Sequence, residues 1–283
     1  MPSLVLIKIV GNMIFFAEGK ELPTKEWKEK YYKDRKQVSS DQGNAPKTIP
    51  PWFKAPHATY KYQQDPVDKI GKDFKEFHDT MLDAVKDAHD MWRLKAQFKD
   101  LKINALTALG SKGCLDGKEL ESDIKNMASG MDGNMKKHRD AVAKGVSKCF
   151  KSWQDSVMIT GLPLYPAFVA FPLATAPPMP NIPVPLIACI SADMTKICMP
   201  DDMAKAMSDA LDGGLKKEDK DKQYEALHKA IATVLSIGFL IWLASQQVML
   251  VLGKGPIPSY APPFVPVGPV VMGENVKAPN LMV

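Results

Sequence analysis

The segment Ser156–Ala192 reads SVMITGLPLYPAFVAFPLATAPPMPNIPVPLIACISA and holds no charged side chain. Prolines interrupt it at positions 163, 166, 172, 177, 178, 180, 183 and 185. Each proline removes a backbone donor and blocks a helix. The segment therefore cannot span a bilayer as a helix, because lipid offers no partner for the freed carbonyls. A hydrated linker would be more polar. The pattern predicts an extended arm that lies along a protein surface.

Two long helices are predicted before this arm. Apolar residues recur every seven positions in two companion series, which is typical of a helix that packs on another helix. The series are Val67, Phe74, Met81, Ala88, and Ile70, Phe77, Ala84, Met91, Phe98. Three glycines cluster in ALGSKGCLDGKE, and a second apolar rhythm runs from Leu120 to Trp153. A short turn between two such helices predicts an antiparallel hairpin over 67–155.

Shorter elements are predicted for the rest of the chain. Leu4–Val10 and Met13–Ala17 flank a Gly11-Asn12 turn and favour a β-hairpin. A short helix at about 201–211 and an apolar helix from about Lys222 follow the arm. The expected fold class is mainly α, with a long antiparallel helical hairpin, a C-terminal apolar helix, a short N-terminal β-hairpin and extended Pro-rich arms.

Composition shifts set the expected boundaries of these parts. They are a β-hairpin at 1–20, a Pro-rich linker at 21–66, the helical hairpin at 67–155, the uncharged Pro-rich arm at 156–200, a short helix and an apolar helix at 201–253, and a Pro-rich C-terminal arm at 254–283.

The end of the chain echoes the segment at 156–192. Both stretches place a tryptophan near a helix end, then a Val-Met pair, a glycine, a tyrosine beside prolines, and Phe-Val, at a spacing of about 95 residues. We interpret the echo as a duplicated unit of a helix and a proline-rich arm; the alternative is a chance resemblance between proline-rich segments. The residues predicted as assembly contacts are Trp153, Tyr165, Phe168, Val169, Phe171, Trp242, Tyr260, Phe264 and Val265.

Two apolar arms need more cover than one helical hairpin gives. Burying ten of their side chains is worth on the order of 15–25 kcal/mol before ordering costs. We therefore expect neighbouring copies or other subunits to cover the arms. Ala230–Gly253 is also uncharged and long enough to span a bilayer. Ser236, Ser245 and the Gln246-Gln247 pair suit a packed bundle better than lipid.

No sequence motif of a known catalytic or cofactor site is present. His78 and His89 share a helix face, but a separation of about 16 Å along the axis prevents them from sharing one metal ion. LDGKELESD and MDGNMKKH lack the acids of a calcium loop. We therefore expect no enzyme activity, no cofactor and no metal. The net charge is +5, with both signs interspersed, so nucleic-acid binding is not predicted.

The N-terminus and the cysteines indicate the compartment. MPSLVLIKIV lacks a positively charged start, and Lys8 interrupts its apolar run, so no signal peptide is predicted. Cysteines at 114, 149, 189 and 198 form no C-x-x-C pair. Free thiols in a reducing compartment are expected, with a local bridge between Cys189 and Cys198 as the alternative.

The stretches KGVSKCFKSWQDSVMITGLPLYPAF and PPMPNIPVPL, within Ala141–Ala192, resemble structural proteins of contractile phage tails and phage-like injection systems, such as those of the baseplate or tail tip. The resemblance implies a structural subunit of a virion or phage-like particle that is assembled in the bacterial cytoplasm. Its implied partners are copies of itself and other structural subunits. The alternative is a membrane-inserting protein, pore-forming or translocated, with a span at 230–253.

Overall fold

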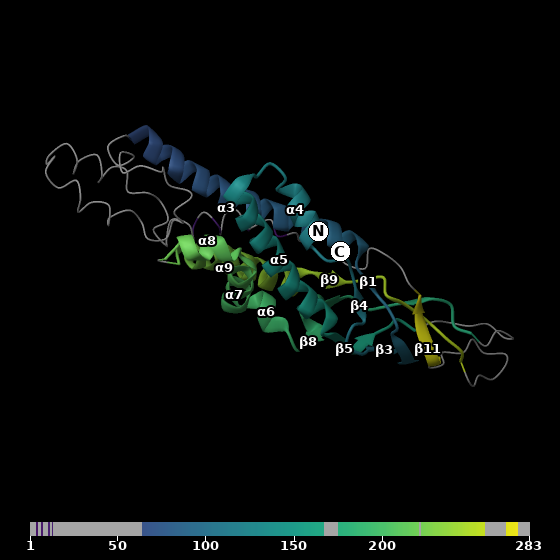
Figure 1. Ribbon diagram of the computed structural model, residues 1–283. Helices are drawn as coiled ribbons and strands as arrows, with labels where there is room; N and C mark the ends of the chain where they lie inside the picture. The colour runs from purple at the N-terminus through teal and green to yellow at the C-terminus, as the bar shows by residue number, and fades with distance from the viewer. Residues whose placement is uncertain are drawn as a thin grey trace, which may run out of the picture.

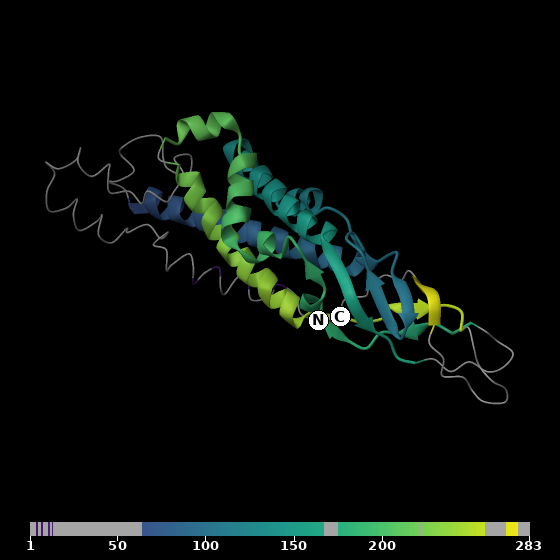
Figure 2. The same cartoon turned by 90° about the horizontal axis from the view of Figure 1, so that it is seen from below.

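The computed structural model describes residues 4, 7, 11, 13, 64–166, 175–220, 222–257 and 270–276. In this part of the chain helices make up 56% and strands 22%. The helices gather at one end and most of the strands at the other (Figures 1 and 2). The expected mainly-α class is therefore wrong, because a large antiparallel sheet forms a substantial part of the fold.

Three long helices form the frame of the described chain: α3 (Gln64–Lys95), α5 (Gly133–Asp155) and α9 (Gln223–Ser245). The shorter helices are α4 (Glu121–Met127), the 3-10 helix η5 (Leu186–Ala188), α6 (Met194–Cys198), α7 (Pro200–Ala210) and α8 (Gly213–Glu218). α7 packs between α5 and α9. Its bounds and those of α9 confirm the two helices predicted after the arm.

Within the described residues, the main sheet has seven antiparallel strands in the order β6-β10-β11-β2-β3-β5-β8 and curls into a half-barrel. Its strands are β2 (Lys102–Ala105), β3 (Thr107–Gly110), β5 (Val157–Pro163), β6 (Met179–Pro180), β8 (Ile190–Ser191), β10 (Leu252–Lys254) and β11 (Val270–Val276). Tyr165 N donates to Pro180 O at 2.9 Å, and Ile182 N donates to Pro163 O at 2.8 Å. These bonds connect the chain at the end of β5 to β6 and partly close the half-barrel there.

Two small sheets lie between the helices and the main sheet. β1 (Gln97–Phe98) pairs with β4 (Leu115–Asp116), and β9 (Gln247–Val248) pairs with β7 (Val184–Pro185). Both pairs are antiparallel. β1 directly follows α3, and β9 directly follows α9, so the two small sheets occupy corresponding places at two helix ends.

The predicted helical hairpin over 67–155 is wrong. The chain leaves α3 and forms β1, β2, β3 and β4 before it reaches α4 and α5. The apolar rhythm after Leu120 is also interrupted at 128–132, between α4 and α5. Strands of two to four residues give no period that a sequence scan can detect. The heptad spacing identifies buried positions of α3 correctly, namely Phe74, Phe77, Met81, Ala84 and Ala88.

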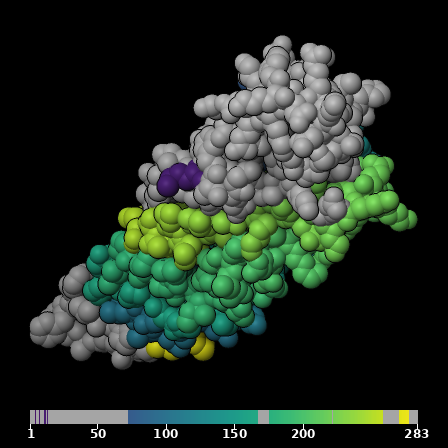
Figure 3. Space-filling model, turned by 90° about the vertical axis from the view of Figure 1, so that its left-hand side faces the viewer, coloured from purple at the N-terminus to yellow at the C-terminus, as the bar shows by residue number. Residues whose placement is uncertain are grey.

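The predicted N-terminal β-hairpin is also wrong at the residues described. Ile7, Gly11 and Met13 have helical backbone, and Ile7 N donates to Leu4 O at 3.0 Å. Leu4 and Ile7 are buried, and a Cβ added to Gly238 of α9 would lie 2.9 Å from Ile7 Cγ1. Figure 3 shows these purple residues beside the yellow-green band of the later chain. The spacing of the apolar residues fits a helix face as well as it fits a hairpin. The linker predicted at 21–66 lies outside the described residues, except for 64–66, which begin α3.

The segment at 156–192 is not a free arm where the structure describes it. It supplies β5, β6, β7, β8 and η5. Its side chains buried in the chain's own core include Val157, Ile159, Leu162, Leu164, Met179 and Leu186. Pro180 and Pro185 lie on edge strands, where a missing donor costs least. Much of the apolar surface that we expected other subunits to cover is therefore covered by the same chain.

The three long helices meet at two triangles of aromatic rings. The ring centroids of Trp92 and Trp153 are 6.1 Å apart, those of Trp92 and Trp242 are 6.0 Å apart, and those of Trp153 and Trp242 are 5.6 Å apart. Three residues before each tryptophan lie His89, Phe150 and Phe239, with separations of 5.8, 5.8 and 5.6 Å. Equivalent residues of three helices thus surround one line, so α3, α5 and α9 are related by an approximate threefold axis.

The strands that follow the helices obey the same threefold relation. β2 follows α3, β5 follows α5 and β10 follows α9; their respective partners are β11, β3 and β6. Each long helix, the strand that follows it and the partner of that strand form one unit. The chain passes from β2 to β3, from β5 to β6 and from β10 to β11, so each of these connections leads into the next unit. The last step returns to the first unit. We call these units the first, second and third repeats, after α3, α5 and α9.

Gly145 on α5 allows α7 to approach closely. A Cβ at this position would lie 2.5 Å from Met207 N. Gly145→Ala is expected to lower the free energy of unfolding by about 1–3 kcal/mol. Alanine otherwise favours a helix interior over glycine by about 1 kcal/mol, so a net loss reports the contact with α7. Urea unfolding followed by circular dichroism measures it.

Gly130→Ala is the matched control, because no atom of the described residues lies within 4 Å of its added Cβ. We expect its free energy of unfolding to stay within about 0.5 kcal/mol of the original. Equal losses in the two variants would contradict the close packing of α7 on α5.

Candidate functional site

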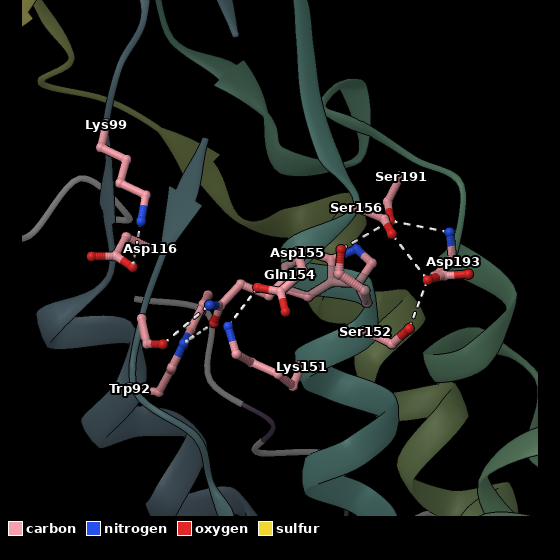
Figure 4. A network of polar contacts seen from close by, with 12 residues as sticks. Trp92, Lys99, Asp116, Lys151, Ser152, Gln154, Asp155, Ser156, Ser191 and Asp193 are labelled. Carbon is pink, nitrogen blue, oxygen red and sulfur yellow. Dashed lines mark hydrogen bonds and ion pairs between the residues drawn. The ribbon is translucent and has the colours of Figure 1, made fainter. Parts of the chain in front are cut away.

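A polar junction forms where α5 ends (Figure 4). Ser152 Oγ and Ser156 Oγ donate to Asp193 Oδ2 at 2.6 and 2.9 Å. Lys196 Nζ donates to Ser152 Oγ at 2.8 Å and lies 3.1 Å from Asp193 Oδ1. Ser191 Oγ donates to Trp153 O at 3.0 Å. The junction connects the end of α5 to β8 and α6.

The geometry of this junction does not suit catalysis. A serine beside a lysine becomes a nucleophile when a neutral lysine takes its proton. Here Lys196 Nζ is paired with Asp193 and donates to Ser152 Oγ, so the geometry is that of a structural ion pair. Hydrogen bonds from Ser152, Ser156 and Lys196 hold the pKa of Asp193 below its usual range, which makes this carboxylate a weaker base. The junction therefore anchors α6 to α5.

The buried histidines and the Cys189 thiol are also poorly placed for proton transfer or nucleophilic attack. Burial lowers the pKa of His89 to about 3, of His138 to about 4 and of His228 to about 3. Burial raises the pKa of the Cys189 thiol to about 12, so it stays protonated and unreactive. All four cysteines are free, and the alternative bridge between Cys189 and Cys198 is not formed. Across the described ranges, no group of three or more His, Cys, Asp or Glu side chains is placed to hold a metal ion.

Asn275 of β11 holds the bend between β1 and β2. Leu101 N donates to Asn275 Oδ1 at 2.9 Å, and Asn275 Nδ2 donates to Phe98 O at 2.9 Å. The bend contains Asp100 in the left-handed region, with φ 56°. Both polar groups of one amide are thus satisfied by the backbone of the first repeat.

Asn181, which follows β6, does the same in the third repeat. Val251 N donates to Asn181 Oδ1 at 2.9 Å, and Asn181 Nδ2 donates to Val248 O at 2.9 Å. The bend again contains a left-handed residue, Leu250, with φ 61°. The threefold relation therefore extends from the core to individual hydrogen bonds at the junction of helix and sheet.

Asn181→Ala and Asn275→Ala are each expected to lower the free energy of unfolding by about 2–3 kcal/mol, because each leaves a donor and an acceptor of the bend without its partner. Chemical denaturation measures the loss. Asn104→Ala is the control, since Asn104 is exposed on β2, and a change within about 0.5 kcal/mol is expected. A loss of stability in only one of the two asparagine variants would contradict the equivalence of the two bends.

The strand pairing also places one exposed apolar residue on each repeat. Three residue pairs occupy corresponding positions of the three repeats. Gly273 pairs with Ile103 in the first repeat, Gly110 with Ile159 in the second and Met179 with Gly253 in the third. The residues that precede Gly110, Gly273 and Met179 are Leu109, Met272 and Pro178. All three side chains are exposed, Leu109 to 40% and Met272 to 86%. We call Leu109, Pro178 and Met272 the apolar ring.

Further exposed apolar side chains lie at the same end of the molecule: Tyr165 at 48%, Ile182 at 38%, Ile190 at 50% and Val271 at 41%. Exposed side chains of this kind, gathered on one part of a surface, mark contact sites for other proteins. The outside of the sheet end is therefore the candidate functional site.

The structure separates the predicted assembly contacts into three groups. Trp153 and Trp242 are each 1% exposed and lie in the aromatic core, so neither is on a surface where it could contact another subunit. Tyr165 is exposed at the sheet end, next to β6. The others lie outside the described residues: Phe168, Val169, Phe171, Tyr260, Phe264 and Val265.

No protein-family model, curated protein or solved structure matches the chain. The geometry of the sheet end is therefore the basis for a functional conclusion. The sequence interpretation missed the apolar ring and the structural hydrogen bonds of Asn181 and Asn275. A usable signal was present, because Pro178-Met179-Pro180-Asn181 and Met272-Gly273-Glu274-Asn275 stand almost as far apart as Tyr165 and Tyr260.

Among the described helices, α9 is long and apolar enough to cross a membrane by length and composition. The relevant window has a mean hydropathy of 1.7, and 67% of it is buried inside the protein. Phe239 and Trp242 contribute to the two aromatic triangles. This burial gives α9 a place in the core of the fold.

Proposed function

We propose that the chain is a structural subunit of a large multi-subunit particle, of the kind that contractile phage tails and phage-like injection systems represent. It docks through the outside of its sheet end. The observation that carries the proposal is the apolar ring of Leu109, Pro178 and Met272, with one member on each of the three repeats of one curled sheet. Partners are other structural subunits and copies of the chain, and its location is the assembled particle.

Two features support this function over chemistry or membrane insertion. The polar junction at Asp193 uses its groups to hold helices together, which leaves no activated nucleophile there. Insertion of α9 into lipid would remove Trp242 and Phe239 from the core that the three repeats share. Residues 167–174 and 258–269, which belong to the arms predicted at 156–200 and 254–283, lie outside the described residues.

Incorporation of charged variants into the native particle tests the proposal. Met272→Asp places a carboxylate on the apolar ring, and the φ of 51° at this position is one that aspartate tolerates. Incorporation is expected to fall about tenfold or more, because a carboxylate buried without a partner in an interface costs more than about 1.4 kcal/mol. Circular dichroism and the free energy of unfolding of the isolated chain are expected to stay unchanged.

Met199→Asp is the matched control, since Met199 is 55% exposed between α6 and α7 and is not a member of the apolar ring. Normal incorporation of both variants would contradict docking through the sheet end. Flotation of the isolated chain with liposomes, as a defined inserted species, would contradict the structural role and favour the membrane-inserting alternative.

A further inference from the structure

The symmetry of the docking end indicates the symmetry of its partner. Each repeat presents one member of the apolar ring at a corresponding point of the strand pairing. The approximate threefold axis passes through the tryptophan triangle, whose sides of 6.1, 6.0 and 5.6 Å are nearly equal. The chain is one polypeptide, but it offers three related surfaces around one axis.

A partner with a single binding surface would cover one repeat and leave two apolar positions in water. Self-association through one such surface has the same shortcoming, because it engages one repeat of each copy at a time. A homotrimer has three identical surfaces around its own threefold axis. When the two axes coincide, each partner subunit meets one repeat, and all three members of the ring are buried together.

We propose that the partner is a homotrimeric protein that binds one copy of this chain end-on, with its threefold axis on the axis of α3, α5 and α9. The inference rests on the proposed function, because it specifies the partner of the same docking end. The three repeats then make three quasi-equivalent contacts with identical sites. The chain converts the threefold end of that partner into a single, closed end.

The differences between repeats fit quasi-equivalent contacts of this kind. Leu109, Pro178 and Met272 differ in shape but share apolar character and exposure, which suffices for three copies of one apolar site. The repeats also differ in their strand connections: β2 passes to β3 through Leu106 alone, whereas β5 and β10 reach β6 and β11 through long segments.

Site-specific photo-cross-linking tests the inference. Benzoylphenylalanine is placed at Leu109, Pro178 or Met272, one position at a time, in the full-length chain within cells that make the particle. After irradiation, mass spectrometry identifies the linked peptide. All three positions are expected to link to the same partner polypeptide and to overlapping peptides of it. The control position is Met199, which is expected to give no link to that peptide.

Links to three different polypeptides, links from one position alone, links to another copy of this chain or no links would each overturn the homotrimer. These failures leave the proposed function intact when the chain still copurifies with the particle. Absence of the chain from the particle would overturn both proposals together.

Discussion

Replacing Trp153 by alanine is expected to lower the free energy of unfolding by about 3–5 kcal/mol, the range for a fully buried tryptophan. Its ring touches the rings of Trp92, Trp242 and Phe150, with centroids 6.1, 5.6 and 5.1 Å away. Trp153 Nε1 has no hydrogen-bond partner among the described residues, so the expected loss is one of packing. A cavity at the centre of the triangle removes contacts from all three repeats at once.

Guanidinium unfolding followed by circular dichroism at the helix band measures this loss without relying on tryptophan fluorescence. Ile241→Ala is the control on α9, because Ile241 is 42% exposed, and a loss below about 1 kcal/mol is expected. Trp92→Ala and Trp242→Ala are expected in the same range as Trp153→Ala. A cost for Trp153→Ala no greater than for Ile241→Ala would contradict the shared core.

Acid is expected to unfold the protein between about pH 6 and pH 4. The pKa values of His89, His138 and His228 fall to about 3, about 4 and about 3 because burial opposes the charged ring. The folded state keeps these rings neutral, whereas the unfolded chain binds protons below about pH 6.5. Stability from neutral rings is complete above that pH and is lost as the pH falls toward the folded pKa values.

Each histidine contributes a slope of about 1.4 kcal/mol per pH unit, so the three together remove about 4 kcal/mol per unit. Two such units remove about 8 kcal/mol, which is comparable to the whole stability of a typical domain, about 5–15 kcal/mol. The measurement is the free energy of unfolding between pH 7 and pH 4. His89→Phe completes a triangle of phenylalanines and is expected to reduce the slope by about one third. A flat profile would contradict the neutral, buried histidines.

The sequence predicted the buried helix faces better than it predicted the topology. The seven-residue spacing of Phe74 and Met81 reports a helix that buries one side, and both side chains are fully buried. The same spacing carries no information on the elements after the helix. β1 and β4 have two residues each, too few for an alternation to appear, so a turn was expected where four strands form.

Proline content predicted extended backbone correctly, but not its partner. β5 and β6 are extended, as the prolines require, and they pair within the same chain. The expectation of cover by other subunits assumed a helical hairpin as the only core. Once β2, β3, β10 and β11 exist, the chain has a sheet on which Leu162 and Met179 are buried.

The internal echo identified two of the three repeats. The first repeat escaped notice because its connection from β2 to β3 is a turn at Leu106, with no proline-rich arm to compare. Trp92 and Gln97 stand five residues apart, as do Trp242 and Gln247, and both pairs cross from a helix into a short strand. A comparison based on helix ends would have found the third copy. The threefold arrangement itself follows only from the aromatic distances.

The stoichiometry of the docked assembly tests the central claim most directly. Native mass spectrometry of the chain, purified together with its cross-linked partner, gives the number of each polypeptide. One copy of this chain with three identical partner subunits is the predicted composition. A complex with equal numbers of the two polypeptides would contradict the threefold docking end.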